Sequence, residues 1–579
     1  MISLTIDGKE VTIEKGKTIL DAARKADVYI PTLCHDSRVT PYGACRMCVV
    51  EDKNRGKRLI PSCFTPVRDG MDIVTETPEI VAARRTQLQL MLVNHPLDCP
   101  VCDKAGECSL QELVLRYNIT DTQYHLPEKR KDIDRVSPLI ERNMNRCILC
   151  GLCVRICGEL QGTHEIDFIG RGIETLIGTD GQRPLCCDFC GQCVSVCPVG
   201  ALTDTLFKDV TRVWKLEKHE TVCSHCGLGC SIDLNTEHNK IRRVTAPASD
   251  DGDISNLCVR GRFGWSAYEP SNRLSSPRVR IKNRQETVQW HEAISRAAEN
   301  IDRIRAAYGG DAFAFISSDV WTTEEAYAYQ IFCRSIIGSN NMGSTEAKGY
   351  RQIVTILNEH SGEEWKQGTL TDFEKAEVIL VIGGGAVELH PVLKPMINTF
   401  LKKDGGELVV ISSWRDYLLE RATLPIEIKP ECQEIFLSEL RESLSGNIEC
   451  RQSDVSEFGV DCSELVRLVS LLDGEKEILF LVAPCMFGDN EQLGQLAAYL
   501  NDRVRAILPL GAQCNSRGAM FQAGFSSILQ PGGMPVEKSK RGLNHTDEIF
   551  KAIENGTIKA LYLLGDDPLE NSPDPERIK

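Results

Sequence analysis

The sequence predicts a multidomain chain, α+β in its first half and α/β with a parallel sheet in its second. With 579 residues, it is long enough for roughly three to five domains of ordinary size. Twenty of its 26 cysteines lie at or before Cys258, in regularly spaced sets. After residue 276, short apolar runs alternate with helical stretches, as in doubly wound folds. These observations predict small ligand-bearing domains followed by a larger α/β domain.

The composition argues against several classes of protein. A formal net charge of −15 disfavours a nucleic-acid partner, because phosphate binding needs a basic surface. The N-terminal MISLTIDGKE lacks the basic and apolar segments of a signal peptide. No apolar run reaches about 18 residues, so we expect no membrane span. Bunched cysteines without an export signal indicate metal ligands rather than disulfides, and we expect a cytoplasmic protein.

Residues 1–78 are expected to form the first domain. Apolar and polar residues alternate over residues 2–13 around Asp7-Gly8, which predicts a β-hairpin. Thr18 can cap the short helix that follows. The spacing C-x10-C-x2-C-x14-C then suits a [2Fe-2S] cluster, with a four-cysteine zinc site as the alternative. The predicted ligands are Cys34, Cys45, Cys48 and Cys63.

Residues 79–118 are expected to form a helical domain with a second cluster. An amphipathic helix over 79–94 runs into a loop that Pro96 and Pro100 force to be tight. Three cysteines lie in this loop without a fourth, and a [4Fe-4S] cluster needs four ligands, so a histidine is the candidate for the fourth. The predicted ligands are His95, Cys99, Cys102 and Cys108. The charged residues 119–136 are expected to be a connector.

Residues 137–210 contain the most specific pattern in the chain. C-x2-C-x2-C-x3-C occurs twice, and the second copy ends in Cys-Pro. This is the spacing of bacterial two-cluster ferredoxins, in which the fourth cysteine of each copy binds the other cluster. One [4Fe-4S] cluster is therefore assigned to Cys147, Cys150, Cys153 and Cys197, and a second to Cys187, Cys190, Cys193 and Cys157. Cys186 is out of phase and is interpreted as a spare core thiol.

Residues 30–110 carry a family resemblance. The segments PTLCH, YGACRMCVVE, NHPLDCPVC and AGECSLQ resemble the large iron–sulfur subunit of respiratory complex I. The resemblance implies a β-grasp domain with [2Fe-2S], then a helical domain whose [4Fe-4S] is held by one histidine and three cysteines. Complex I subunits typically keep one cubane in the next domain, whereas this chain has two complete sets. The double set is more like formate dehydrogenase alpha subunits and multicluster [FeFe] hydrogenases.

The spacing C-x2-C-x3-C-x27-C within residues 216–275 defines a fifth set, Cys223, Cys226, Cys230 and Cys258. With the flanking Arg260-Gly261-Arg262, it resembles the [4Fe-4S] domain that opens the molybdenum/tungsten bis-pterin oxidoreductases. A zinc ribbon is the alternative. His225, between two ligands, is interpreted as a neighbour of the cluster or a surface residue.

Residues 276–579 read as an α/β domain. Six apolar runs are expected to be buried parallel strands: 312–316, 378–382, 408–411, 478–483, 505–508 and 560–564. Helices are expected at 292–306 and 323–337. Gly383-Gly384-Gly385 fails the dinucleotide fingerprint because Glu388 replaces the third glycine, so it is interpreted as a tight turn. The six late cysteines are interpreted as core thiols: Cys333, Cys432, Cys450, Cys462, Cys485 and Cys514.

This second half also resembles the pterin oxidoreductases, through GSNNM at 338–342, LHPVLK at 389–394 and LGDDP at 564–568. In formate dehydrogenases a metal-ligating cysteine or selenocysteine followed by histidine comes shortly after the first of these segments. Residues 344–351 read STEAKGYR, with neither. The sequence also ends soon after LGDDP, where such enzymes carry a further domain. We therefore expect a degenerate scaffold without molybdopterin or molybdenum.

The predicted function is electron relay. The chain is expected to hold one [2Fe-2S] and four [4Fe-4S] clusters and no catalytic residue. The resemblance implies a multisubunit, NADH-linked oxidoreductase complex with a flavin-bearing, NADH-oxidising partner and other redox subunits. Such a complex could lie at the cytoplasmic face of a membrane. The alternative is the catalytic alpha subunit of an NAD-linked formate dehydrogenase containing molybdenum or tungsten.

Overall fold

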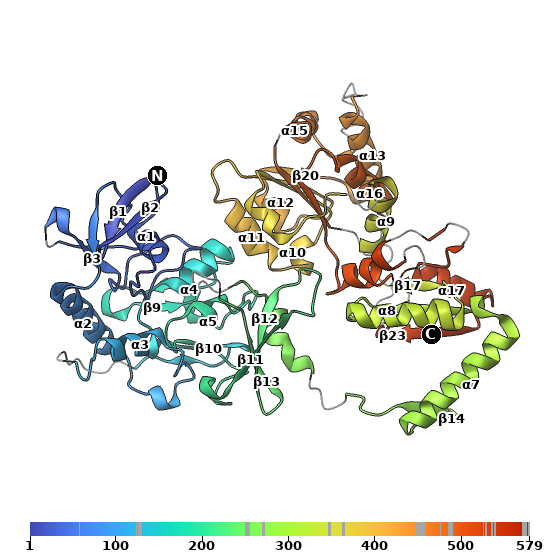
Figure 1. Ribbon diagram of the computed structural model, residues 1–579, viewed down its shortest axis with the longest axis horizontal. Coiled ribbons are helices and arrows are strands. Elements are labelled where there is room, and N and C mark those ends of the chain that lie inside the picture. Colours follow the sequence, from blue (N-terminus) through green and yellow to red (C-terminus); the bar gives the residue numbers. More distant parts are fainter. Residues whose placement is uncertain are drawn as a thin grey trace. The chain divides into compact units, whose positions relative to one another are not determined.

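The computed structural model divides the chain into two compact units (Figure 1). Unit 1 comprises residues 1–222, 230–268 and 394–399, and unit 2 comprises residues 223–229, 269–393 and 400–579. The structure describes all residues except 57, 123, 125–129, 249–254, 269–272, 345–348, 362–364, 447–457, 475, 484–489, 525, 527–529, 534–535, 538–539, 570–575 and 577–579. Unit 2 carries two parallel sheets, whereas the sheets of unit 1 are mixed or antiparallel.

Unit 1 begins with a five-stranded mixed sheet in the order β2-β1-β5-β3-β4. The predicted hairpin is confirmed: β1 pairs antiparallel with β2, and both Asp7 and Gly8 in its turn have positive φ. Thr18 accepts a hydrogen bond from the Asp21 backbone N–H, which confirms it as the helix cap. The elements are β1 (Ile2–Ile6), β2 (Lys9–Ile13), α1 (Ile19–Lys25), β3 (Val49–Asp52), β4 (Leu59–Pro61) and β5 (Asp72–Val74).

Helices α2 (Pro78–Leu92) and α3 (Ser109–Arg116) follow this sheet. A buried arginine ties α2 to its neighbours. The Arg84 side chain is fully buried and donates hydrogen bonds to the Met47 and Val49 carbonyls and the Tyr117 hydroxyl. The ligand-bearing loop between α2 and α3 is thus held at both ends.

The next part of unit 1 contains two short helices that repeat one local structure. Both α4 (Leu152–Arg155) and α5 (Gln192–Val196) follow a glycine in the left-handed region, Gly151 at φ 68° and Gly191 at φ 69°. The remaining elements of unit 1 are β6 (Ile133–Asp134), β7 (Ile140–Asn143), β8 (Asp167–Ile169), β9 (Leu176–Gly178), β10 (Leu202–Asp204), β11 (Glu217–Val222), β12 (Ser231–Glu237), β13 (Lys240–Thr245) and α6 (Val259–Phe263).

Unit 2 holds two parallel sheets, one with the order β20-β19-β18-β21-β22 and one with the order β17-β16-β23. The six predicted segments all form parallel strands, but they are divided between two sheets rather than one. The expected burial is wrong for β23, where Tyr562 and Leu563 are 41% and 44% exposed, because β23 is an edge strand of its sheet. The strands are β16 (Phe313–Ser317), β17 (Met342–Ser344), β18 (Val378–Ile382), β19 (Glu407–Ser412), β20 (Leu424–Glu427), β21 (Ile478–Val482), β22 (Ala506–Pro509) and β23 (Ala560–Leu564), with a separate hairpin of β14 (Arg278–Ile281) and β15 (Arg284–Thr287).

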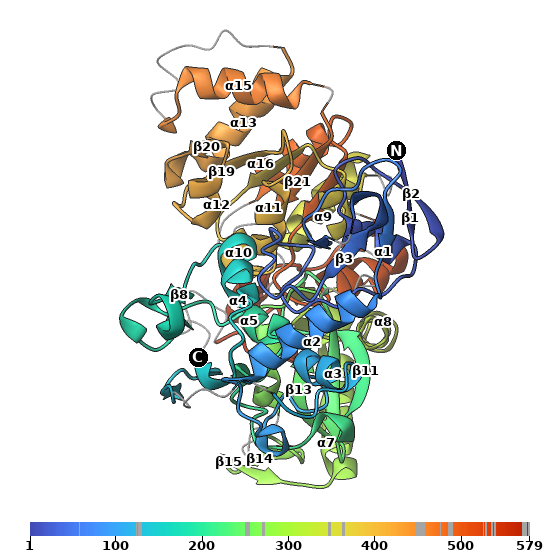
Figure 2. The same ribbon diagram turned by 90° about the vertical axis from the view of Figure 1, so that its left-hand side faces the viewer.

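Helices cover both faces of the five-stranded sheet (Figures 1 and 2). On one face, α9, α13, α15 and α16 pack on the alternate strand residues Val378, Leu380 and Ile382 in one apolar core. On the other face lie α10 and α12. The helices are α7 (Trp290–Tyr308), α8 (Thr323–Ile331), α9 (Tyr350–Ser361), α10 (Ala386–Leu389), α11 (Leu393–Phe400), α12 (Tyr417–Arg421), α13 (Gln433–Leu444), α15 (Cys462–Leu472), α16 (Glu491–Leu500) and α17 (Thr546–Glu554).

The glycine run after β18 has a structural reason. Gly383 has a φ of 106°, and any side chain there would collide with the Ala483 carbonyl. A glycine is required because the chain turns sharply against a neighbouring backbone.

Candidate iron–sulfur cluster sites

The first predicted set lies in unit 1, beside the N-terminal sheet. Cys34, Cys45, Cys48 and Cys63 are each at most 4% exposed. A hydrogen bond with Cys45 lowers the pKa of Cys34 to about 6, and one with Cys63 lowers the pKa of Cys48 to about 7. The contact with Cys48, burial and the charge of Cys34 raise the pKa of Cys63. The structure therefore brings all four sulfurs together.

The second set surrounds the loop between α2 and α3. His95, Cys99 and Cys108 line a cavity of about 290 Å³ whose other walls are largely apolar, including Leu92 and Val114. The Nδ1 atom of His95 is buried and has no hydrogen-bond partner in the described part of the chain. Burial lowers the pKa of His95, which favours the neutral ring that binds metal. This unpartnered nitrogen fits the predicted role of His95 as a ligand.

The third ligand of that set, Cys102, lies against a different part of unit 1. A side chain at Gly200 would collide with the Cys102 sulfur. The backbone at Gly200, just after Cys197, therefore approaches this sulfur closely. Arg146 lies close by and forms an ion pair with Asp98. Burial raises the pKa of Cys102, and the positive charge of Arg146 opposes this rise.

In the two ferredoxin-type sets, the fourth cysteine of each copy lies near the first three cysteines of the other copy. Cys197 joins the three cysteines of the first copy in lining one small cavity, together with Met144, Val199 and other apolar residues. In the second copy, burial raises the pKa of Cys187, Cys190 and Cys193, and the charge of Cys157 raises it further. These four cysteines therefore also lie near one another.

The two copies present the same hydrogen bonds to sulfur. The Leu149 backbone N–H donates to Cys147 Sγ at 3.3 Å, and the Phe189 N–H donates to Cys187 Sγ at 3.4 Å. Leu149 and Phe189 both adopt positive φ, which turns their N–H groups toward the sulfurs. Such hydrogen bonds stabilise negative charge on sulfur and set cluster potentials.

Burial favours the protonated form of these cysteines as they stand. Burial raises the pKa of Cys147 and Cys187 to about 11 and that of Cys190 to about 12, so at neutral pH an apolar site holds protonated thiols. Metal ligation needs thiolates, which nearby iron would stabilise. No three His, Cys, Asp or Glu side chains of the described residues lie close enough to hold a metal ion as they stand. The cysteines of the first copy instead surround a cavity.

The fifth set straddles the division of the chain. Cys223 and Cys226 belong to unit 2, and Cys230 and Cys258 belong to unit 1. Cys223, Cys226 and Cys258 are buried, and Cys230 is half-buried. Cys258 is the N-cap of α6, where its sulfur accepts a hydrogen bond from the Gly261 backbone N–H at 3.5 Å.

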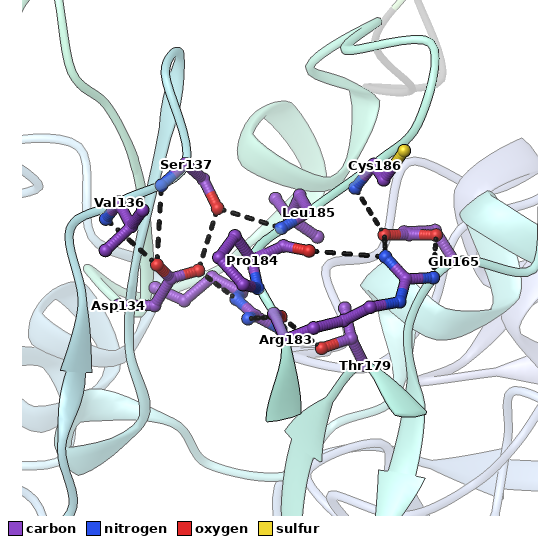
Figure 3. Close-up of polar contacts among 10 residues, drawn as sticks. Asp134, Val136, Ser137, Glu165, Thr179, Arg183, Pro184, Leu185 and Cys186 are labelled. Carbon is purple, nitrogen blue, oxygen red and sulfur yellow. Dashed lines mark hydrogen bonds and ion pairs between the residues drawn. The ribbon is translucent and has the colours of Figure 1, made fainter. Parts of the chain in front are cut away.

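The segment before Cys187 is fixed by two carboxylates (Figure 3). Glu165 binds both terminal nitrogens of Arg183 and accepts from the Cys186 backbone N–H at 2.6 Å. Asp134 accepts from the Ser137 hydroxyl, which in turn accepts from the Leu185 N–H at 3.0 Å. Cys186 itself is exposed, so its interpretation as a core thiol was wrong. Its backbone, not its sulfur, has the structural role.

The late cysteines are only partly as expected. Cys333 is fully buried, as predicted for a core thiol. Cys432, Cys462 and Cys514 are half-buried, because they lie at the edges of helices or a cavity rather than in a core. Cys450 and Cys485 lie outside the described residues.

Unit 2 contains a cavity beside Tyr350 and the segment 508–517. It measures about 240 Å³ and is lined by residues that include Gly227, Tyr350, Gly511 and Cys514. Residues 345–348 of the segment that departs from the formate dehydrogenase pattern lie outside the described residues. Close to this segment, Arg351 and Asp319 form a fully buried ion pair, and the Ser344 hydroxyl donates to Asp319.

Sequence reasoning missed one class of residue at these sites, arginines that are buried (Arg146, Arg262) or half-buried (Arg155). Arg146, Arg155 and Arg262 contact cluster loops from positions distant in sequence, for example Arg155 donating to the Cys34 carbonyl at 2.6 Å. Motif spacing carries no information on such contacts.

Family comparisons match nearly the whole chain in consecutive segments. Residues 1–78 match the "2Fe-2S iron-sulfur cluster binding domain" and 84–123 the "NADH-ubiquinone oxidoreductase-G iron-sulfur binding region". Residues 137–203 match the ferredoxin-like domain of "NADH-quinone oxidoreductase subunit 3". Residues 216–269 match the "Molybdopterin oxidoreductase Fe4S4 domain", and 273–579 match "Molybdopterin oxidoreductase". Domains that bind 2Fe-2S and 4Fe-4S clusters are thus present.

Three relatives illustrate the range of similar proteins. NADPH-Fe(3+) oxidoreductase subunit alpha of Geobacter sulfurreducens is 33% identical over all of this chain and 73% of its own length. A G-type NADH-quinone oxidoreductase subunit of Rhizobium meliloti is 31% identical over all of this chain and 71% of its own length. A Staphylococcus aureus protein provisionally named formate dehydrogenase is 28% identical over 75% of this chain and 48% of its own length.

No helix among the described residues combines the length and apolar character needed to cross a membrane. The four consecutive iron–sulfur segments, the molybdopterin oxidoreductase match over 273–579 and the similarity of the whole chain to a G-type NADH-quinone oxidoreductase subunit agree with one another. The chain belongs to the family of G-type NADH-quinone oxidoreductase subunits and their relatives, iron–sulfur proteins that carry a molybdopterin oxidoreductase domain.

Proposed function

We propose that this chain is the iron–sulfur electron-transfer subunit of a multisubunit, NADH-linked oxidoreductase. The observation that carries the proposal is the crossed pairing in unit 1, where Cys197 joins Cys147, Cys150 and Cys153 around one cavity. Cys153 and Cys193 are close enough to affect each other's charge, which supports two neighbouring cluster sites. Adjacent one-electron centres are what a relay requires.

The proposed cofactors are one [2Fe-2S] cluster, held by Cys34, Cys45, Cys48 and Cys63, and four [4Fe-4S] clusters. Of these four, one is held by His95, Cys99, Cys102 and Cys108, two by the crossed ferredoxin sets, and one by Cys223, Cys226, Cys230 and Cys258. When bound, such clusters accept and release single electrons. The chain's own residues bury the sulfurs, exclude water and donate backbone hydrogen bonds to them.

The proposed partners are a flavin-bearing, NADH-oxidising subunit and a further redox subunit, in the cytoplasm or at the cytoplasmic face of a membrane. Three of the relatives have names that refer to an NADH or NADPH oxidoreductase. Electrons would enter from the flavin and pass along the clusters of unit 1.

We propose that unit 2 does not bind a metal–pterin cofactor. The cavity beside Tyr350 measures about 240 Å³, below the roughly 300–1,000 Å³ of ordinary small-molecule sites, and a bis-pterin cofactor is larger than most of these ligands. A buried Asp319–Arg351 pair stands close to the position expected for a metal ligand. Unit 2 then contributes structure rather than catalysis.

The second candidate is a catalytic formate dehydrogenase subunit, favoured by the double ferredoxin set and the Staphylococcus aureus relative. Metal analysis of the complex purified without oxygen separates the two. We expect about 18 iron atoms per chain, from one two-iron and four four-iron clusters, and no molybdenum or tungsten. Zinc in place of iron would contradict the relay, and stoichiometric molybdenum or tungsten with formate oxidation would favour the enzyme.

Purification of the native complex also tests the proposed partner subunits. A flavoprotein that oxidises NADH should co-purify with the chain, and NADH should reduce the clusters only when that subunit is present. Reduction by NADH of the isolated chain would contradict the proposed division of labour.

A further inference from the structure

Arg262 is a buried charge without an ionic partner. It lies in α6 and is 4% exposed. Its side chain makes no ion pair with any described residue, and its Nη2 atom is buried without a hydrogen-bond partner in the same part of the chain. Enclosing a lone guanidinium is strongly unfavourable, because an unpaired buried ion loses its hydration without gaining a counter-charge. Such an arrangement calls for a negative group that protein atoms do not supply.

The surroundings of Arg262 identify that group. Its Nε donates to the Cys190 carbonyl at 3.0 Å. The sulfurs of Cys190, Cys193 and Cys258 each attract its positive charge. Asp204 also attracts it from β10 but forms no ion pair with it in the described part of the chain. The guanidinium thus faces the ligand loop of the second ferredoxin-type set and the N-cap cysteine of its own helix.

The loop that contains Cys190 and Cys193 leaves space for the Arg262 side chain. Gly191, between Cys190 and Cys193, has a φ of 69°, and a side chain there would collide with Arg262 Cδ and Nε. The Arg262 backbone N–H also donates to the Cys258 carbonyl at 3.0 Å, which fixes the start of α6. Arg262 is therefore packed between two ligand positions that lie 68 residues apart in sequence, at Cys190 and Cys258.

We propose that Arg262 is an electrostatic positioning residue that raises the reduction potential of the cluster held by Cys157, Cys187, Cys190 and Cys193. A cluster with four thiolates carries net negative charge, and reduction adds one more electron without breaking any bond. A fixed positive charge nearby stabilises the reduced form more than the oxidised form. Arg262 keeps its charge in a buried site because guanidinium does not deprotonate in proteins.

The inference rests on the proposed electron-relay function and extends it. It assigns a direction of tuning to one cluster and names the residue responsible. Through Cys258 the same charge acts on a ligand of the fifth set, where we expect a smaller effect of the same sign. Arg262 would then favour residence of the electron at the end of the ferredoxin-type domain.

The test is a redox titration of the full chain, followed by electron paramagnetic resonance, for the wild type, Arg262→Gln and Arg262→Lys. In Arg262→Gln we expect one [4Fe-4S] component to show a reduced-to-oxidised ratio about tenfold lower at a fixed potential. That change corresponds to a downward shift of about 59 mV for one electron. Arg262→Lys keeps the charge and should recover most of the shift. Arg503→Gln is the control, because Arg503 lies in unit 2, where it pairs with Asp473.

Each outcome has a defined meaning. Unchanged potentials in Arg262→Gln, or equal shifts in the glutamine and lysine variants, would overturn the inference. If Arg262→Gln loses about four irons while Arg262→Lys and Arg503→Gln keep them, the charge is required as the counter-ion, which supports the inference. Loss of iron in the lysine variant too would show that shape, not charge, matters, and would overturn it. If the proposed electron-transfer function is wrong, the wild-type protein itself should lack clusters. That outcome is distinct from every result expected for the Arg262 variants.

Discussion

The hydrophobic cores of the two units differ in composition. The main core of unit 2 consists of aliphatic and aromatic residues from five parallel strands and the helices on one face. The main core of unit 1 includes the predicted ligands Cys34, Cys45, Cys108, Cys150, Cys153 and Cys197. Unit 1 has only short strands and helices around those cysteines. The difference suggests that unit 2 is stabilised by apolar burial, whereas unit 1 depends on what its cysteines bind.

Removal of iron should therefore affect the two units unequally, and this is the largest effect we expect. Anaerobic chelation should expose the backbone amides of residues 137–210 to rapid hydrogen exchange, because buried thiols do not replace the lost metal–sulfur bonds. Strands β18 and β21 should keep their protection. Equal loss of protection in both units would contradict the comparison.

A single cysteine substitution tests the iron dependence of unit 1 at one cluster site. Cys197→Ser should remove about four of the roughly 18 irons, because Cys197 completes the set begun by Cys147. Cys514→Ser is the matched control in unit 2 and should leave the iron content unchanged. Iron and acid-labile sulfide are the measurements. Retention of all iron in Cys197→Ser would contradict the crossed pairing.

The buried ion pair of unit 2 should matter for folding and not for iron. Arg351→Leu leaves the Asp319 carboxyl buried without its cationic partner, since both side chains are fully buried. We expect a loss of about 3–5 kcal/mol in the free energy of unfolding of unit 2. The double variant Asp319→Leu/Arg351→Leu should recover much of this loss. Denaturant unfolding followed by unit 2 probes tests it, and a change in cluster spectra would count against the separation of roles.

The segment before Cys187 should respond to pH. Burial raises the pKa of Asp134, but hydrogen bonds from Ser137 and Arg142 more than offset this and hold it below its ordinary value. A carboxyl with a lowered pKa contributes stability above its unfolded pKa, about 3.9, and loses it as pH falls through the folded value. Asp134→Asn should remove about 1.5–3 kcal/mol at neutral pH.

The test is to measure iron release as the pH is lowered. The wild-type protein should begin to lose iron below about pH 4, where Asp134 becomes protonated. Asp134→Asn should release iron faster at pH 7, and its iron release should not increase further when the pH falls through the pKa of Asp134. Asp167→Asn, at an exposed aspartate in β8 of the same unit, is the control. If wild type and Asp134→Asn release iron with the same pH dependence, Asp134 does not stabilise the segment before Cys187.

Removal of a helix cap should lower the stability of either unit by a similar amount, and this is the smallest effect that we expect. Thr18 caps α1 in unit 1 and Thr322 caps α8 in unit 2, each by accepting from a backbone N–H at 3.2 Å. Thr18→Ala and Thr322→Ala should each cost about 1 kcal/mol. Thermal unfolding measures this, and neither change should alter iron content. A much larger cost in unit 1 would mean that the cap also supports a cluster loop.

Local patterns predicted much of this molecule. The hairpin at Asp7-Gly8, the Thr18 cap and the strands at 378–382 and 560–564 depend on neighbours in sequence, and the structure has them as expected. The cysteine sets follow from fixed spacing, and the structure brings the sets of unit 1 together. Their role as ligands stays a prediction.

Features that depend on contacts distant in sequence could not be predicted. The division of the parallel strands into two sheets results from packing among segments more than two hundred residues apart, such as β16 and β23. Cys186 was wrongly placed in a core because its sequence position does not show that its backbone binds Glu165 and its sulfur points outward. The contact of Arg262 with Cys190 is of the same kind.

The crossed pairing has a consequence for how the protein is made. On that pairing, the second ferredoxin-type set is complete only at Cys193 and the first only at Cys197, although Cys147 is synthesised fifty residues earlier. A nascent chain that stops between the two copies would carry three of the four ligands of the first set and only Cys157 of the second. Cofactor insertion into this domain is therefore expected to be a late event that waits for synthesis of the second copy.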